Sequence, residues 1–174
     1  KIYEASASQM FGVPIELIKK GNPEYALRQK GKVAELALGY QGSTGALINM
    51  GALDMGIPEE DLPDIVSRWR EANKRIRDLW YSMDNAAVQV TSASLTGMDL
   101  ASGSVGINGL LLAREYDYNQ GTDCFTIQLP SGRKLYYVSP GIGENQWGNP
   151  SISYMGMDQK TKRWKRIETY GGKL

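Results

Sequence analysis

Four side chains between residues 28 and 40 have the types and spacing of an anion-binding surface. Arg28, Lys32, Leu36 and Tyr40 follow one another at intervals of four residues, so they line one stripe of a helix. Arg28 and Lys32 stand one turn apart with no acidic residue between them, and their repulsion costs roughly a few tenths of a kcal/mol. A helix that keeps such a cationic pair is suited to receiving an anion.

An ordinary solvated face is the alternative reading of the same stripe. In that reading Glu24 pairs with Arg28, Glu35 screens Lys32, and Tyr40 is a surface aromatic at the end of a helix. The spacing alone leaves both readings open.

The surrounding segments carry a family resemblance. Arg-x3-Lys-x7-Tyr resembles the finger-helix motif of the family A (DNA polymerase I-like) DNA polymerases. The lead-in IYEASASQMFGVPIELI resembles the segment before that helix, and GKVAELALGYQGSTGAL is most similar to the bacteriophage branch. The match runs nearly unbroken from residue 2 to about residue 53.

The resemblance implies a role for each residue of the stripe. Arg28 and Lys32 match the cations that hold the triphosphate of the incoming dNTP, and Lys32 is a candidate general acid for the departing pyrophosphate. Leu36 stands beside the sugar, where the family usually has Phe or Tyr, so sugar discrimination is left open. Tyr40 matches the aromatic residue that stacks at the templating position.

The turn after the tyrosine is expected to touch DNA. The resemblance implies that Gln41 and Gly42 lie beside the template strand. Gln41 replaces the glycine that usually follows the tyrosine, which leaves the backbone conformation of that turn open.

Composition excludes several classes of site. The 174 residues include 20 basic and 19 acidic side chains, one cysteine (Cys124) and no histidine. A cysteine-based zinc site, an internal disulfide and any mechanism that needs imidazole are therefore excluded. Without a signal peptide or a long apolar run, we expect a soluble, cytoplasmic protein with no membrane partner. A first residue of Lys within a predicted helix leads us to expect a piece of a longer protein.

The catalytic metals of the resembled family are held outside this sequence. Their aspartates lie in an Asp-x-Ser-x-x-Glu segment and a His-Asp-Glu segment, and neither segment occurs here. The resemblance implies Mg²⁺ in the full-length enzyme, no ligands for it in this chain, and a fragment that is inactive alone. The carboxylates at residues 59–61 fit a helix start after Pro58 better than a metal site. The implied partners are a DNA primer-template, a dNTP, and the palm and thumb of the parent polymerase.

Helical patterns position the stripe. We expect a helix over residues 2–12 that ends at Gly12, and the striped helix over residues 23–40. Leu27, Gly31, Ala34 and Leu38 form the packing face of the striped helix. A further helix capped by Ser43 or Thr44 is expected to bury Leu47, Met50 and Leu53.

The apolar positions from Ile65 to Val90 predict one long helix, or two with a bend near Asn73. Trp69 and Trp80 are expected in the core. The other face carries Arg68, Arg70, Lys74, Arg75 and Arg77, and both DNA phosphates and plain solvent suit it.

Beyond Thr96 the pattern changes to short strands. We expect them over residues 110–116, 124–129, 134–138, 152–157 and 164–169, with a hairpin turn at residues 130–132. LPSGRKLYY resembles a basic segment that lies near the primer-template in the family, so Arg133 and Lys134 are candidate DNA contacts. The alternative is solvated charge at a hairpin tip.

The C-terminal stretch has five cations between Lys160 and Arg166, around Trp164. This pattern suits a nucleic-acid backbone with a stacked base, and it also suits an edge strand protected from aggregation. TYGGKL resembles the joint at which phage-type enzymes return to the palm.

The predicted fold class is α+β, with a helical fingers subdomain over residues 2–95 and a β-rich antiparallel insertion over residues 97–170. The corresponding domains are residues 1–96, which contain the nucleotide-binding helix 23–40, and residues 97–174, which return toward the palm. The expected function is the fingers region of a template-directed DNA polymerase. A non-catalytic DNA-binding module and an α+β interaction domain are the alternatives.

Overall fold

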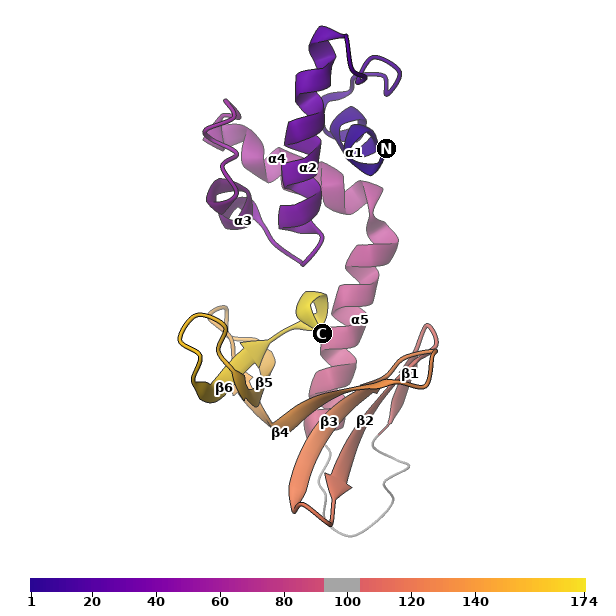
Figure 1. The fold of residues 1–174 in the computed structure, drawn as a ribbon, viewed down its shortest axis with the longest axis vertical. Coiled ribbons are helices and arrows are strands. Elements are labelled where there is room, and N and C mark those ends of the chain that lie inside the picture. The colour runs from indigo at the N-terminus through magenta and orange to yellow at the C-terminus, as the bar shows by residue number, and fades with distance from the viewer. Residues whose placement is uncertain (93–103) are drawn as a thin grey trace. The chain divides into compact units, whose positions relative to one another are not determined.

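The computed structural model describes residues 1–92 and 104–174 and has the expected α+β class. N-terminal helices precede a six-stranded antiparallel sheet (Figure 1). By packing, the chain divides into two compact units, residues 1–79 and 80–174, and the division falls within one helix. The expected functional boundary after residue 96 stays a prediction.

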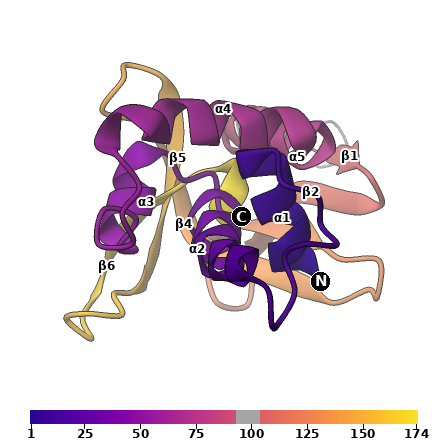
Figure 2. The ribbon, with the colours of Figure 1, turned by 90° about the horizontal axis from the view of Figure 1, so that it is seen from above.

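The first unit is built on two helices in close contact, α1 (Ile2–Phe11) and α2 (Leu27–Leu38), shown side by side in Figures 1 and 2. Gly31 makes the approach possible, because a Cβ atom there would lie 2.1 Å from the backbone oxygen of Tyr3. Ala34 and Leu38 are fully buried on the same face of α2. The predicted packing face is therefore confirmed at Gly31, Ala34 and Leu38, whereas Leu27, its fourth residue, is only partly buried.

The helix ends follow the local sequence. Gly12 ends α1 with a φ of 66°, a left-handed conformation that glycine adopts without strain. The stretch expected as one helix from Pro23 is instead a 3-10 turn, Pro23–Ala26, that leads into α2.

The next helix, α3 (Thr44–Asn49), buries Leu47 but not Met50 or Leu53. That part of the prediction was wrong, because α3 ends at Asn49. Met50 is already its C-terminal cap, and Leu53 follows in a turn.

Of the two alternatives left open for residues 65–90, the structure has two helices with a break at Asn73. The break separates α4 (Leu62–Ala72) from α5 (Lys74–Ser92). The side-chain amide of Asn73 donates to the backbone oxygen of Trp69 at 2.9 Å, and this bond satisfies a carbonyl at the end of α4. Trp69 and Trp80 are both buried, as expected.

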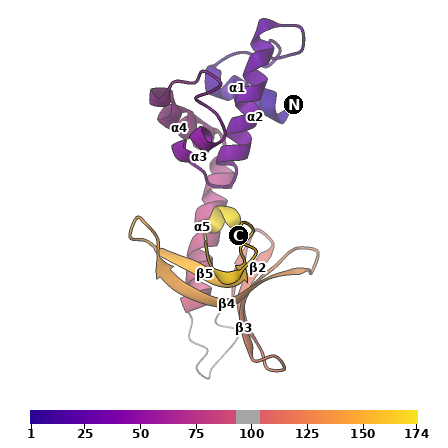
Figure 3. The same cartoon turned by 60° about the vertical axis from the view of Figure 1, so that its left-hand side comes forward.

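The second unit carries the sheet (Figure 3), and the strands of this sheet follow chain order. Its strands are β1 (Val105–Ile107), β2 (Leu110–Asp117), β3 (Thr122–Gln128), β4 (Lys134–Glu144), β5 (Pro150–Met157) and β6 (Trp164–Thr169). The five predicted strands are present, and the three-residue β1 is an addition. Gly132 closes the predicted hairpin turn by donating its N–H to the oxygen of Leu129.

Three aromatic side chains on neighbouring strands of the sheet form a cluster in this unit. Phe125, which is fully buried, contacts Tyr137, and Tyr137 meets Tyr154 edge to face. Arg114 makes a bidentate pair with Asp123 and also donates to the oxygen of Thr91 at 2.7 Å, which ties β2 to the last turn of α5.

The chain ends in a 3-10 turn, Gly171–Lys173, against α5. A Cβ atom at Gly171 would lie 1.8 Å from the oxygen of Trp80, so only glycine fits there. Across residues 1–92 and 104–174, no helix combines the length and the apolar character needed to cross a bilayer.

Candidate nucleotide-facing surface of α2

The stripe predicted on α2 lies on the side of the helix away from its packing face. Arg28 and Lys32 are partly exposed, Leu36 is 41% exposed, and Tyr40 just beyond the helix is 65% exposed. We call these four residues the α2 stripe. Because Gly31, Ala34 and Leu38 are buried in the core, the stripe lies on a face of α2 that a ligand can reach.

Arg28 is paired within the first unit, but not with Glu24. Its Nε atom donates to Oε1 of Glu4 on α1 at 3.1 Å, and its guanidinium lies 5.3 Å from the ring centroid of Tyr3. The pKa of Glu4 is lowered, mainly by a backbone hydrogen bond at Glu4 itself and further by the hydrogen bond from Arg28. Desolvation of the carboxylate opposes this shift without cancelling it. Glu4 therefore stays ionised and holds the guanidinium in place.

Lys32 differs from Arg28. No ion pair or side-chain hydrogen bond joins it to any of the residues that the structure describes. Glu35, which the solvated-face reading placed beside it, points elsewhere. Its Oε1 atom accepts hydrogen bonds from Ser6 Oγ and from the Trp69 indole, the latter at 3.1 Å. The positive charge of Lys32 is thus uncompensated by its described neighbours.

The turn after α2 has a fixed backbone. Gln41 has a φ of 63°, in the left-handed region that non-glycine residues enter at a cost of about 1–2 kcal/mol. Its N–H donates to the oxygen of Leu38 at 3.0 Å. The conformation that the sequence left open is therefore the one a glycine would favour, and it is retained with glutamine.

Gly42 is held from α4. Nη2 of Arg70 donates to the Gly42 oxygen at 3.1 Å, and a Cβ atom at Gly42 would lie 2.0 Å from the oxygen of Ala37. Sequence reasoning assigned Arg70 only to a basic face and missed this contact. The spacing of residues 42 and 70 gives no signal from which this hydrogen bond could be predicted.

The basic face of α4 and early α5 is largely neutralised within the first unit. Arg68 pairs with Asp64 at 2.7 Å, Lys74 with Glu71, and Arg77 with Asp78. These contacts favour a solvated, internally paired face over a phosphate-binding one.

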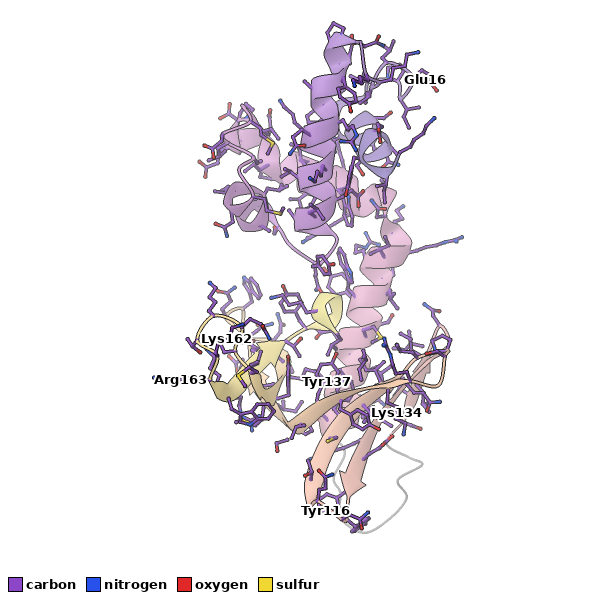
Figure 4. All side chains as sticks on the ribbon, in the orientation of Figure 1. Glu16, Tyr116, Lys134, Tyr137, Lys162 and Arg163 are labelled. Atoms are coloured by element: carbon purple, nitrogen blue, oxygen red, sulfur yellow. The ribbon has the colours of Figure 1, made fainter. Side chains whose placement is uncertain are left out.

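Arg133 and Lys134 belong to the second unit and are described apart from the α2 stripe. Arg133 is exposed at the β3–β4 turn. Lys134 is paired with Glu115 at 2.7 Å, and this hydrogen bond is the main cause of its raised pKa. Figure 4 shows Lys134 on the sheet, at the start of β4.

The acidic residues do not assemble a metal site within the described parts of the chain. No group of three or more Asp, Glu or Cys side chains is placed to hold an ion there. Glu59, Glu60 and Asp61 form a short 3-10 turn that leads into α4, which is the helix-start role expected for them.

Comparison with known proteins gives one match over the whole chain. The sequence is 47% identical over 175 aligned positions to the DNA polymerase of Bacillus phage SP02, and the alignment covers 100% of this chain and 24% of that protein. The chain is therefore homologous to that polymerase along its whole length, and it spans about a quarter of the polymerase's length.

A weaker match covers part of the chain. It is 29% identical over 102 positions to the large ribosomal subunit protein bL20 of Prochlorococcus marinus (strain MIT 9303), which covers 56% of this chain and 82% of that protein. No family model matches the sequence, and no solved structure matches it significantly.

Proposed function

We propose that this chain is the fingers region of a template-directed DNA polymerase, and that the α2 stripe binds the triphosphate of the incoming dNTP. Homology to a phage polymerase over the whole chain supports the general assignment. The observation that carries the specific role is the uncompensated charge of Lys32, one turn from Arg28 on the exposed face of α2.

The two cations divide the work by their chemistry. A guanidinium offers a planar fork to phosphate oxygens, whereas an ammonium acts as a compact point charge that can also give up a proton. Arg28, positioned by Glu4, orients the triphosphate. Lys32 neutralises charge as pyrophosphate departs and serves as the candidate general acid.

The C-terminal end of the stripe faces the template. Tyr40 offers an exposed ring to the templating base, and the backbone of Gln41 and Gly42, fixed by Leu38 and Arg70, sets its direction. Leu36 contacts the sugar without ring stacking, so its discrimination between sugars rests on shape alone.

The remaining parts of the reaction lie with other segments of the parent protein. Mg²⁺ would be held by carboxylates of the palm, because no group of three or more acidic or cysteine side chains among the described residues here is placed to hold a metal ion. The primer-template would be gripped jointly with the palm and thumb, and Arg133 and Lys134 are the candidate DNA contacts of the second unit.

Single-turnover primer extension with the full-length protein tests this proposal. Lys32→Ala is expected to slow incorporation by roughly 10²–10⁴-fold if Lys32 is the acid, and Arg28→Ala to raise KM for the dNTP. Lys30→Ala is the matched control, since Lys30 lies on the same helix but rests 5.6 Å from the ring centroid of Phe11.

Wild-type incorporation by the Lys32→Ala protein would refute the nucleotide-binding role. DNA binding that is unaffected by dNTP in the wild-type protein would favour the non-catalytic DNA-binding module instead.

A further inference from the structure

The turn between β5 and β6 is organised by a single carboxylate. Asp158 accepts the backbone N–H groups of Lys160 and Thr161 at 3.1 Å and 2.6 Å, and its Oδ2 atom lies 2.7 Å from Nζ of Lys165. The hydrogen bond from Lys165, followed by those from Thr161, keeps the pKa of Asp158 well below its ordinary value. The turn therefore has a defined shape at neutral pH.

This turn and the start of β6 present cations that no carboxylate balances. Lys165 is neutralised by Asp158, but none of the others is ion-paired with any residue among 1–92 and 104–174. They are Lys160, Lys162, Arg163 and Arg166. Figure 4 shows Lys162 and Arg163 together at the β5–β6 turn, at the opposite end of the sheet from Lys134.

Arg166 is held in an extended position by neutral groups. Its Nη1 atom donates to the oxygen of Ser139 at 3.2 Å and to Oγ of Ser153 at 3.1 Å. Since both acceptors are uncharged, the guanidinium is fixed over β5 while its charge stays available.

The sheet register sets Trp164 beside Arg166. Trp164 pairs with Met157 and Arg166 with Met155, so all four side chains lie on one face of the β5–β6 hairpin. Trp164 is 58% exposed although it is the largest side chain of β6. Glu168 is the acidic residue of β6 on the same face, two positions beyond Arg166.

We propose that this face of the β5–β6 hairpin binds single-stranded nucleic acid, with the four cations on the phosphates and a base stacked on Trp164. A polyanion matches the run of uncompensated positive charge. The exposed indole of Trp164 can stack on a flat ring that is attached to that polyanion. An unpaired nucleotide offers such a ring, whereas the bases of a duplex are already stacked on one another. This site is independent of the α2 stripe.

Fluorescence anisotropy of a short labelled oligothymidylate, titrated with the 174-residue chain in the absence of dNTP, tests the proposal. Trp164→Ala is expected to weaken binding by about 5- to 150-fold, the usual value of one base–aromatic stack. Trp147→Ala is the matched control and is expected to have no effect. Trp147 is 75% exposed in the turn between β4 and β5, and residues 145–149 of this turn carry no charge.

Charge reversal separates local from overall electrostatics. Lys162→Glu combined with Arg163→Glu is expected to abolish most of the affinity, whereas Lys19→Glu combined with Lys20→Glu changes the net charge equally and is expected to leave it intact. Four phosphate contacts predict a salt slope of about −2.8, or about 50-fold weaker binding between about 50 mM and about 200 mM salt.

Three results would overturn the proposal. The first is that the Trp164→Ala and wild-type proteins bind the oligothymidylate with equal affinity. The cations would then serve to protect an edge strand from aggregation. The second is that the duplex formed by oligothymidylate and oligoadenylate binds as tightly as single-stranded oligothymidylate, or more tightly. The third is loss of binding with Tyr40→Ala but not with Trp164→Ala, which would move the oligonucleotide to α2. Circular dichroism of each variant confirms that its fold is retained.

Discussion

Replacing Gly31 by alanine tests the packing that presents the α2 stripe. The added Cβ atom would lie 2.1 Å from the oxygen of Tyr3, 2.9 Å from the nitrogen of Ala7 and 3.0 Å from its Cβ atom. Two of these three atoms are backbone, so no side-chain rotation relieves the overlap. Restoring ordinary contact at 3.4 Å requires α1 and α2 to separate by more than 1 Å.

Two opposing contributions set the size of the effect. Overpacking a close contact costs about 1–3 kcal/mol and occasionally more, and a separation would also weaken the pair between Arg28 and Glu4. Alanine in place of glycine inside a helix returns about 1 kcal/mol. With the overlap at the severe end, we expect Gly31→Ala to lower the free energy of unfolding by about 2 kcal/mol.

Gly45→Ala is the matched control. Gly45 also lies in a helix, α3, but a Cβ atom there would meet nothing within 4 Å. This variant is expected to raise the free energy of unfolding by about 0.5–1 kcal/mol. Urea denaturation followed by far-ultraviolet circular dichroism measures both. If Gly31→Ala is as stable as Gly45→Ala, then α1 and α2 are not in close contact. The inference that their packing leaves the α2 stripe exposed would then be wrong.

Three further predictions use the same denaturation assay. Gln41→Gly is expected to be about 1 kcal/mol more stable than Gln41→Ala, because both lose the side chain but only glycine relieves the left-handed backbone; equal stabilities would contradict that conformation. Asp123→Ala is expected to cost about 3 kcal/mol by leaving Arg114 without its bidentate partner, and a loss below about 1 kcal/mol would show that the pair is dispensable. Burial raises the pKa of Asp84, which has an unpartnered oxygen among the described residues, so the folded state binds this proton more tightly than the unfolded state. The ionised carboxylate destabilises the folded state, and this destabilisation should therefore fade as pH falls through the raised pKa toward the ordinary 3.8. Asp84→Asn should raise the free energy of unfolding by about 1 kcal/mol at pH 7 and remove that pH dependence. An unchanged pH profile would refute this.

Features that depend on near neighbours in the chain were predictable. The two faces of α2 and the turn at Gly132 follow from helical periodicity and from local turn chemistry, whereas the break at Asn73 was one of two alternatives that periodicity left open. The relation to a polymerase was also readable over residues 2–53, because a motif such as Arg28-x3-Lys32-x7-Tyr40 is a property of sequence alone, and the comparison extends the match to the whole chain. Where such reasoning failed, as at Met50, an apolar pattern ran past the point where the helix stops.

The partners of the candidate site were decided by tertiary structure. Arg28 is 24 positions from Glu4, and Arg70 is 28 positions from Gly42, and no periodicity links residues at such separations. Only the packing of α1 and α4 against α2 brings them together.

The sequence by itself determined which side chains the protein offers and along which stripe of α2 they lie, because the helical repeat fixes directions over a few residues. The tertiary structure decided which charges remain available. Arg28 is engaged by Glu4, while Lys32 has no described partner. On β6, Trp164 and Arg166 share a face because side chains alternate along a strand. Their neighbours on β5 are set by the strand register, and the Ser139 oxygen that accepts from Arg166 is brought close by the packing of β4. The physical reason is that the partners of Arg28 and Arg166 lie far away in the sequence, so only the packing of the chain brings them into contact.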